Sequence, residues 1–184
     1  VFVARDSAEL AAFAEHGDSI LESDTERFKD MPFVIGIGEG AIRRKIATHF
    51  VGKIKFGNLI HPTATFARRQ RELLESRQGI IISAGVRFTS NIVAGDFTIF
   101  NLNATVSHDC VIEDFVTISP QACILGNVEI KSGAWIGANV TINQGTNVSK
   151  RMIGPNTIIG SGAVVLHDCH DNSVYAGVPA RKIK

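Results

Sequence analysis

His108 and Asp109 are the residues of this 184-residue chain whose types and spacing best suit chemistry. His108 lies between Val106 and Cys110, which occupy inward positions of a repeating region, so we expect the imidazole to point outward. Asp109 is placed to orient the ring. Adjacent strand residues point to opposite faces, so this pairing requires the chain to turn at residues 108–109. A plain surface histidine is the alternative interpretation.

Gly126 follows His108 by eighteen residues. If the repeat stacks residues eighteen apart, a glycine above the histidine leaves a cleft with a bare backbone N–H beside a candidate base. A base that deprotonates an amine or hydroxyl, next to an amide that holds a developing oxyanion, suits acyl transfer.

A zinc site would require three converging histidines. Only His108 lies on a strand of the repeat, and we therefore expect no metal site. The six histidines are His16, His49, His61, His108, His167 and His170.

The region that must position these residues has a period of six. One series, large and apolar, comprises Ile82, Phe88, Ala94, Phe100, Val106, Ile112, Ile118, Ile124, Ile130, Ile136, Ile142 and Val148. A second series of small or β-branched residues runs two positions ahead of it, from Ile80 to Thr146. This period predicts a parallel β-helix of hexapeptide repeats, in which three hexads form one coil and neighbouring coils lie about 4.8 Å apart.

The register slips once, because only five residues separate Val148 from Ile153. We therefore expect a loop or distorted corner at residues 149–152. Residues 67–77 are helical in character and are expected to cap the open end of the prism or to interrupt its first coil. The β-helix domain is expected to span residues 59–184.

Residues 1–58 lack the period and are expected to form a small α/β domain. We predict strands at 1–4 and 32–37 and a helix at 7–14 capped by Ser7. A second helix, at 41–50, should place Ile42, Ile46 and Phe50 on one face. The turn Gly38-Glu39-Gly40 between strand and helix is a geometry that binds nucleotides, although an ordinary tight turn has the same sequence pattern.

The composition excludes several partner classes. The net charge of +1 gives no sign of a nucleic-acid partner, and no apolar run is long enough to span a membrane. Three cysteines without metal-binding spacing are consistent with a cytoplasmic protein.

Several motifs resemble those of bacterial hexapeptide-repeat sugar acetyltransferases. The motifs are 107–112 (SHDCVI), 126–130 (GNVEI), 137–139 (GAN), 160–165 (GSGAVV) and 176–181 (AGVPAR). The closest group contains the sialic acid O-acetyltransferases and the nucleotide-linked amino-sugar N-acetyltransferases of the PglD type. The resemblance covers nearly the whole chain, including residues 35–38 and 42–45 of the first domain.

The resemblance implies a left-handed β-helix, a homotrimer with active sites between neighbouring prisms, and acetyl-CoA as co-substrate without a permanently bound cofactor. His108 would be the general base, and Asp109 would raise its basicity. The N–H of Gly126 would hold the thioester carbonyl. The other implied contacts are Asn101 with the acceptor pocket, Thr117, Ala138, Gly160, Ser161 and Arg181 with the coenzyme, and Gly38 and Gly40 with the acceptor's nucleotide.

The chain departs from this group in three ways. Its members usually open with a strand and a glycine-rich turn upstream of the point where this sequence begins, so we expect a truncated or remodelled acceptor domain. Thr117 stands where a second histidine is common, and the loop near residues 149–152 is longer. Because of these departures, the resemblance does not determine the identity of the acceptor.

The leading prediction is an N-acetyltransferase that acts on a nucleotide-linked amino sugar in surface-glycan biosynthesis. The first alternative is O-acetylation of a sugar such as sialic acid. The alternative from another class is a non-catalytic β-helix scaffold or binding module.

Overall fold

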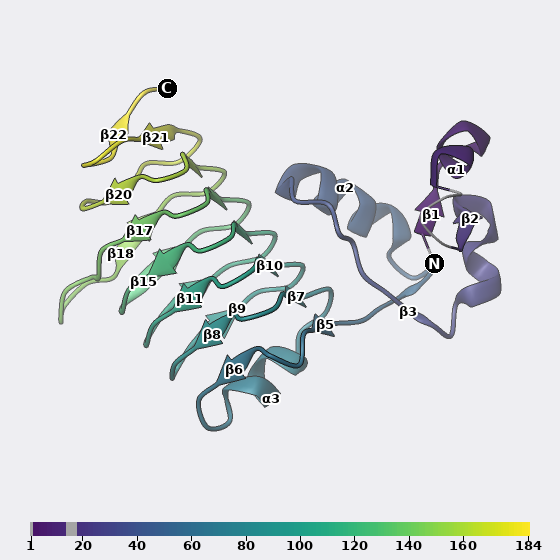
Figure 1. Cartoon of the computed structure of the whole chain (residues 1–184), viewed down its shortest axis with the longest axis horizontal. Coiled ribbons are helices and arrows are strands. Elements are labelled where there is room, and N and C mark those ends of the chain that lie inside the picture. Colours follow the sequence, from purple (N-terminus) through teal and green to yellow (C-terminus); the bar gives the residue numbers. More distant parts are fainter. Residues whose placement is uncertain (1, 14–17) are drawn as a thin grey trace.

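The computed structural model describes residues 2–13 and 18–184, and most of it is a three-sided prism of short parallel strands (Figure 1). The first face has eight strands: β5 (Leu59–Ile60), β7 (Ile81–Ile82), β10 (Ile99–Phe100), β13 (Thr117–Ile118), β16 (Trp135–Ile136), β19 (Ile158–Ile159), β21 (Val174–Ala176) and the antiparallel β22 (Arg181–Lys182).

The second face has six strands: β6 (Thr65–Phe66), β8 (Arg87–Phe88), β11 (Thr105–Val106), β14 (Cys123–Ile124), β17 (Thr141–Ile142) and β20 (Val164–Val165). The third face has four: β9 (Val93–Ala94), β12 (Val111–Ile112), β15 (Val128–Ile130) and β18 (Arg151–Ile153). The chain visits the three faces in turn, so each coil has three corners.

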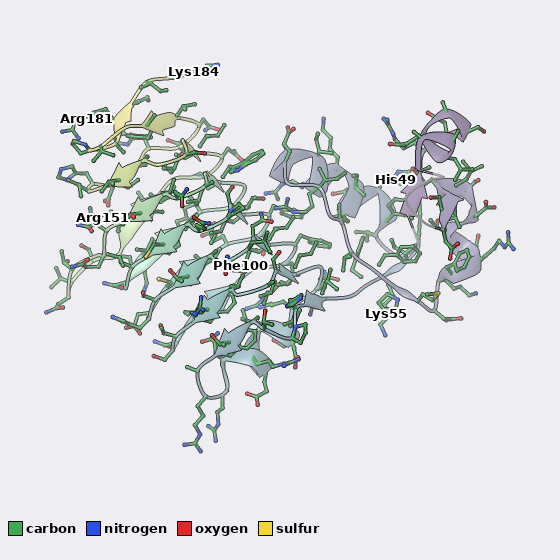
Figure 2. All side chains as sticks on the ribbon, in the orientation of Figure 1. His49, Lys55, Phe100, Arg151, Arg181 and Lys184 are labelled. Atoms are coloured by element: carbon green, nitrogen blue, oxygen red, sulfur yellow. The ribbon has the colours of Figure 1, made fainter. Side chains whose placement is uncertain are left out.

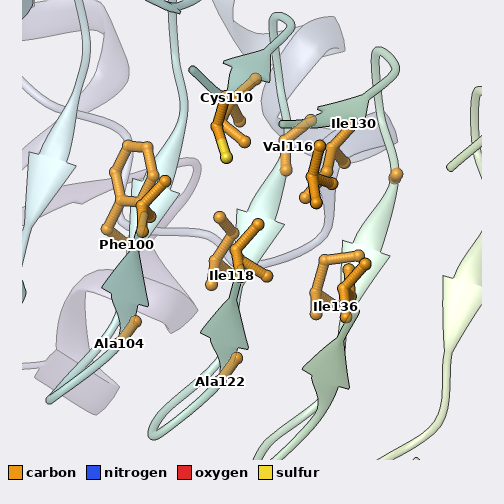
Figure 3. Close-up of a cluster of buried hydrophobic side chains, with 14 of the residues drawn as sticks. Phe100, Ala104, Cys110, Val116, Ile118, Ala122, Ile130 and Ile136 are labelled. Carbon is orange, nitrogen blue, oxygen red and sulfur yellow. The ribbon is translucent and has the colours of Figure 1, made fainter. Parts of the chain in front are cut away.

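Residues eighteen apart pair across neighbouring coils, as the period of six requires. Phe100 pairs with Ile118, and Ile118 with Ile136. These side chains are fully buried and lie above one another in the interior, where Figure 3 shows them with smaller residues such as Ala104 and Cys110. The predicted left-handed parallel β-helix is confirmed.

The corners repeat a left-handed backbone conformation every six residues. Positive φ occurs at positions 79, 85, 91, 97, 103, 109, 115, 121, 127, 133 and 139. Glycine, asparagine and aspartate tolerate this conformation best, and most of these positions hold one of them. Phe97 and Phe115 are bulky exceptions, and their rings stack 5.1 Å apart between the prism and the N-terminal part.

The register slip lies earlier than the sequence indicates. Ile142 is the last buried residue before the interruption, whereas Val148 is 94% exposed. Segment 143–150 forms the loop, and residues 151–152 begin strand β18. The expected place of Val148 in the core is therefore wrong. The loop expected at residues 149–152 is present but lies at 143–150, so that only residues 149 and 150 were placed in it correctly.

Helix α3 (Gln70–Glu75) replaces the missing strand of the third face in the first coil. The Gln70 side chain is buried and makes two hydrogen bonds with the backbone of Ile92, one as donor and one as acceptor. Its Nε2 donates to the Ile92 carbonyl at 2.6 Å, and its Oε1 accepts from the Ile92 N–H at 2.9 Å. The predicted helix thus interrupts the first coil and covers the edge of β9.

The N-terminal part begins with β1 (Phe2–Ala4), α1 (Ser7–Phe13), β2 (Ser19–Leu21), the 3₁₀ helix η1 (Glu22–Phe28) and β3 (Pro32–Phe33). Asp6 caps α1, because its Oδ1 accepts from the N–H groups of Ala8 and Glu9, so the prediction of Ser7 as the cap is wrong. The predicted strand at 32–37 is reduced to β3. The expected positions of Val1 and Ala14 lie outside the described residues.

Helix α2 (Gly40–Phe50) connects β3 to strand β4 (Lys55–Phe56), which pairs with β3. The helix packs on the prism. Its buried face contains Arg43, Ala47 and Phe50, whereas Ile42 is 40% exposed, so the predicted apolar face is rotated. None of the described helices is long and apolar enough to cross a membrane.

Candidate active site

The turn that carries His108 and Asp109 lies at the corner between the six-stranded and four-stranded faces. Asp109 occupies one of the left-handed positions, with φ of 62°, which folds its side chain back toward His108. Its Oδ2 lies 2.7 Å from Nδ1 of His108. An ionised carboxylate can only accept, so Nδ1 carries the proton and Nε2 of the neutral ring keeps a lone pair. The turn expected from the sequence is present.

Asp109 is held by a second donor. Nδ2 of Asn91, eighteen residues earlier, donates to its Oδ1 at 2.5 Å. The hydrogen bond from Asn91, followed by that from His108, lowers the pKa of Asp109 below its ordinary value. Asp109 therefore stays anionic and available to the imidazole at mildly acidic pH.

Replacing Asn91 by glycine should raise the pKa of Asp109. The hydrogen bond from Asn91 is the largest cause that lowers this pKa, and the hydrogen bond from His108 comes second. Glycine tolerates the φ of 60° at this position. The titration of the Asp109 carboxyl group, followed by NMR, measures the shift. Asn172→Gly, which removes another asparagine from a left-handed position, is the control, and an unmoved titration of Asp109 in N91G would contradict the prediction.

Gly126 lies directly against the other side of the imidazole. A Cβ built at this glycine would be 2.6 Å from Cε1 and 2.6 Å from Nε2 of His108. Within the described residues, the Gly126 N–H donates no hydrogen bond. A free amide and an imidazole lone pair thus share one small space, as the eighteen-residue spacing predicts.

We expect Gly126→Ala to lower kcat by about 10²-fold, because its methyl group displaces the imidazole from this space. The fold should be preserved, because the exposed ring can rotate outward. Gly36→Ala is the matched control, since no atom of residues 2–13 and 18–184 lies within 4 Å of a Cβ there. Steady-state rates of both variants, compared with their thermal unfolding, test this, and an unimpaired G126A would contradict it.

The pair opens into a cavity of about 610 Å³. Its wall contains hydroxyl and amide groups that suit a hydrogen-bonding ligand. Its lining residues are Ser107, His108, Asp109, Leu125, Gly126, Asn127, Gln144, Gly145, Thr146 and Asn147. Of these, only His108, Asp109 and Gly126 are assigned to the site from the sequence, and the whole stretch from Gln144 to Asn147 is missed. The rule that residues eighteen apart stack would have placed Gln144 above Gly126.

Four other predicted residues lie at a different corner, between the eight-stranded and six-stranded faces. Asn101 follows β10, Ala138 follows β16, and Gly160 and Ser161 follow β19. They form a column up that corner, where the Gly162 N–H donates to the Ala138 carbonyl at 2.8 Å. One chain therefore does not bring them to the His108 cavity.

Thr117, Gly38 and Gly40 belong to the contact between α2 and the prism. The buried Thr117 hydroxyl donates to the Gly38 carbonyl at 2.6 Å and accepts from Arg43 at 3.0 Å, so the coenzyme role predicted for Thr117 has no support in its contacts. Gly40 is also buried, and a Cβ there would lie 2.5 Å from the Phe115 carbonyl oxygen. Close packing explains this glycine better than the predicted nucleotide contact.

Arg181 lies on β22 at the C-terminal end of the prism (Figure 2). Its side chain is exposed, and its Nη1 donates to the neighbouring Ala180 carbonyl at 3.1 Å. It is not among the residues that line the His108 cavity.

Comparison with known proteins finds sugar acetyltransferases. No family model matches the chain. It is 40% identical over 106 residues to GDP-perosamine N-acetyltransferase of Escherichia coli O157:H7, covering 58% of this chain and 48% of that protein. It is 32% identical over 117 residues to galactoside O-acetyltransferase of Escherichia coli strain K12, covering 53% and 55%. The chain thus spans about half the length of these relatives.

The fold is similar to that of the acetyltransferase domain of PglB from Neisseria gonorrhoeae, solved in complex with acetyl coenzyme A. The TM-score is 0.75 at 26% identity, and the match covers 99% of this chain and 97% of that domain. The resemblance to hexapeptide-repeat sugar acetyltransferases indicated by the sequence motifs is confirmed.

Proposed function

We propose, from its similarity to hexapeptide-repeat sugar acetyltransferases, that this chain transfers the acetyl group of acetyl-CoA to the amino group of a nucleotide-linked sugar. One observation carries the proposal. The His108 imidazole is held by Asp109 on one side and meets the bare amide of Gly126 on the other. This arrangement gives a base and an oxyanion donor on a fold whose relatives transfer acetyl groups.

The proposed reaction begins when Nε2 of His108 removes a proton from the acceptor's amine as its nitrogen attacks the thioester carbonyl carbon. The carbonyl oxygen becomes an oxyanion, to which the Gly126 N–H donates. Asp109, bonded to Nδ1, stabilises the imidazolium. The tetrahedral intermediate then collapses, the C–S bond breaks, and the CoA thiolate takes the proton back from Nε2. The amide product and free CoA leave.

The proposal includes a homotrimer. Its support is the separation of the predicted residues, because Asn101, Ala138, Gly160 and Ser161 lie at another corner of the prism from His108. In a trimer, that corner of one copy would face the His108 cavity of the next and supply a coenzyme surface that a single chain does not provide. Arg181 would contribute near the coenzyme's phosphates.

The proposal also divides the chain at residue 58. Residues 1–58 would bind the acceptor's nucleotide, and residues 59–184 would perform the transfer. Support comes from strand β5, which begins at Leu59 and is the first strand of the prism. Gly38 is the better candidate of the two loop glycines for the nucleotide, since it is half-buried whereas Gly40 is buried.

A nucleotide-linked amino sugar is the preferred acceptor, because the N-acetyltransferase among the relatives takes GDP-perosamine by name. Acetylation of such a sugar before glycan assembly would place the reaction in the cytoplasm and in surface-glycan biosynthesis. O-acetylation of a sugar is the second candidate, favoured by the similarity to galactoside O-acetyltransferase.

The test is the release of free thiol from acetyl-CoA in the presence of a panel of acceptors. The panel contains GDP-perosamine, other nucleotide-linked 4-amino and 3-amino sugars, sialic acid and a galactoside, with a His108→Ala variant as background. Turnover with an amino sugar, and a product heavier by one acetyl group, would support N-acetylation. Turnover only with a hydroxyl acceptor would replace it by O-acetylation. No turnover with any acceptor would overturn the proposal.

A further inference from the structure

Lys150 lies behind the active-site turns, and the proposed reaction does not use it. Its side chain reaches back from segment 143–150, and Nζ donates to the backbone carbonyl of Asp109 and, at 2.9 Å, to Oδ1 of Asn127. Asp109 follows the proposed base, and Asn127 follows the proposed oxyanion donor. One ammonium group thus joins the two turns whose separation matters for chemistry.

Asn127 provides the second half of this connection. Its backbone N–H donates to the His108 carbonyl at 2.8 Å. Its side-chain amide donates to the carbonyls of Thr146 and Ser149. Asp109 and Asn127 occupy equivalent left-handed positions on successive coils, with φ of 62° and 58°. Lys150 therefore bridges the same point of two stacked corners.

The segment that carries Lys150 is itself firmly folded. The Thr146 N–H donates to the Ser149 carbonyl at 2.8 Å, and the Ser149 N–H donates to Oγ1 of Thr146 at 3.1 Å. A Cβ at Gly145 would lie 2.3 Å from the Asn127 carbonyl oxygen, so the segment lies tight against the corner. Lys150 is therefore anchored at its backbone as well as at its tip.

His108 needs such support because packing does not fix it. Its side chain is 62% exposed, so the place of the ring depends on the turn beneath it and on Asp109. In acyl transfer the base must deprotonate the amine that attacks a carbonyl group, and the oxyanion donor must bind the oxygen of that same carbonyl group. A misplacement of about 1 Å costs roughly 10²-fold in rate. The spacing between the two turns is therefore a quantity on which the rate depends.

We propose that Lys150 is a positioning residue that sets the separation between His108 and the Gly126 amide through Asp109 and Asn127. This inference rests on the proposed acetyl transfer. The sequence shows the register slip only as a spacing of five instead of six residues. In the structure, the loop at this slip brings Lys150 behind the active site.

Kinetics of Lys150→Met test the proposal on the full chain with acetyl-CoA and GDP-perosamine, or with whichever acceptor of the panel is turned over. We expect kcat to fall about 10- to 100-fold while the KM for acetyl-CoA changes less than about threefold. Lys150→Arg should restore much of the rate, because it can reach both acceptors. Lys131→Met is the matched control, since Lys131 also has two partners, Glu113 and Glu129, and follows β15 at the corner between the four-stranded and eight-stranded faces, away from His108.

NMR of the His108 imidazole, assigned with His108→Ala, gives a readout that does not require turnover. The ring signals should move in K150M, return toward wild type in K150R and stay in place in K131M. Should K150M fail to fold, Asn127→Gly removes the same bridge and should move the same signals. Shifted signals in a protein that acetylates no acceptor would sink the proposed function but keep the bridge. Unshifted signals, or a wild-type kcat in K150M, would overturn the role of Lys150.

Discussion

Replacing His108 by alanine should lower kcat/KM for acetyl transfer by about 10²- to 10⁴-fold, the usual contribution of a general base. The amine would then have to lose its proton to water, while the Gly126 amide could still hold the oxyanion. The fold should not change, because the His108 side chain is 62% exposed and its side-chain hydrogen bond is to the adjacent Asp109. Thiol release measured beside circular dichroism separates the two effects.

His167→Ala is the control for this measurement, because His167 is exposed and does not line the His108 cavity. Its rate should equal that of wild type. A His108→Ala variant with wild-type rate would remove His108 as the base of the proposed reaction.

Replacing Arg43 by methionine should lower the free energy of unfolding by about 3 kcal/mol. Arg43 is completely buried, and its guanidinium donates to the carbonyls of Ile37, Gly38, Phe97, Phe115 and Val116 and to the Thr117 hydroxyl. The carbonyls of Ile37, Phe97 and Phe115 accept from no other group within the described residues. Each carbonyl left buried and unpaired costs about 1–3 kcal/mol. Because the substitution also removes a buried charge, which is itself unfavourable, part of the summed cost of the three carbonyls is offset.

Burial lowers the pKa of Arg43 to about 10, so the group remains charged at neutral pH. For a chain of this length the loss corresponds to a fall in Tm of roughly 6–12 °C. Arg44→Met is the matched control. Arg44 is exposed, has one hydrogen bond to Ser132 and lies 4.2 Å from the centre of the Phe115 ring, so we expect less than about 1 kcal/mol there. Equal Tm values for the two variants would contradict the prediction.

The prism could be predicted because its larger inward series is apolar, and the three-sided coil repeats this series every six residues. The pair formed by His108 and Asp109 could be predicted for a related reason. The inward positions on either side were already filled, so two adjacent polar residues had to lie at a corner. Gly126 followed from the stacking of residues eighteen apart.

The loop could not be placed correctly, because Thr146 and Val148 satisfy the period although they lie outside the prism. The position of the loop outside the prism is set by hydrogen bonds from Asn127 to the loop and by hydrogen bonds within the loop. The bonds from Asn127 come from a neighbouring coil, which a local sequence pattern does not show. Arg43 was missed because Ile42, Ile46 and Phe50 have the spacing of an apolar face. Helix α2 instead packs on corner carbonyls that require donors, and a sequence pattern does not show such acceptors.

The Gln70 side chain on α3 bears on how the first coil limits the addition of further strands to the end of the prism. A prism of parallel strands ends in open edges, and an open edge is a template on which a strand of another copy can add and begin a growing filament. Next to β9, the backbone N–H and carbonyl of Ile92 are already occupied by the two ends of one amide side chain. A single glutamine thus takes the place that an added strand would need at Ile92, which disfavours polymer growth from this face of the first coil.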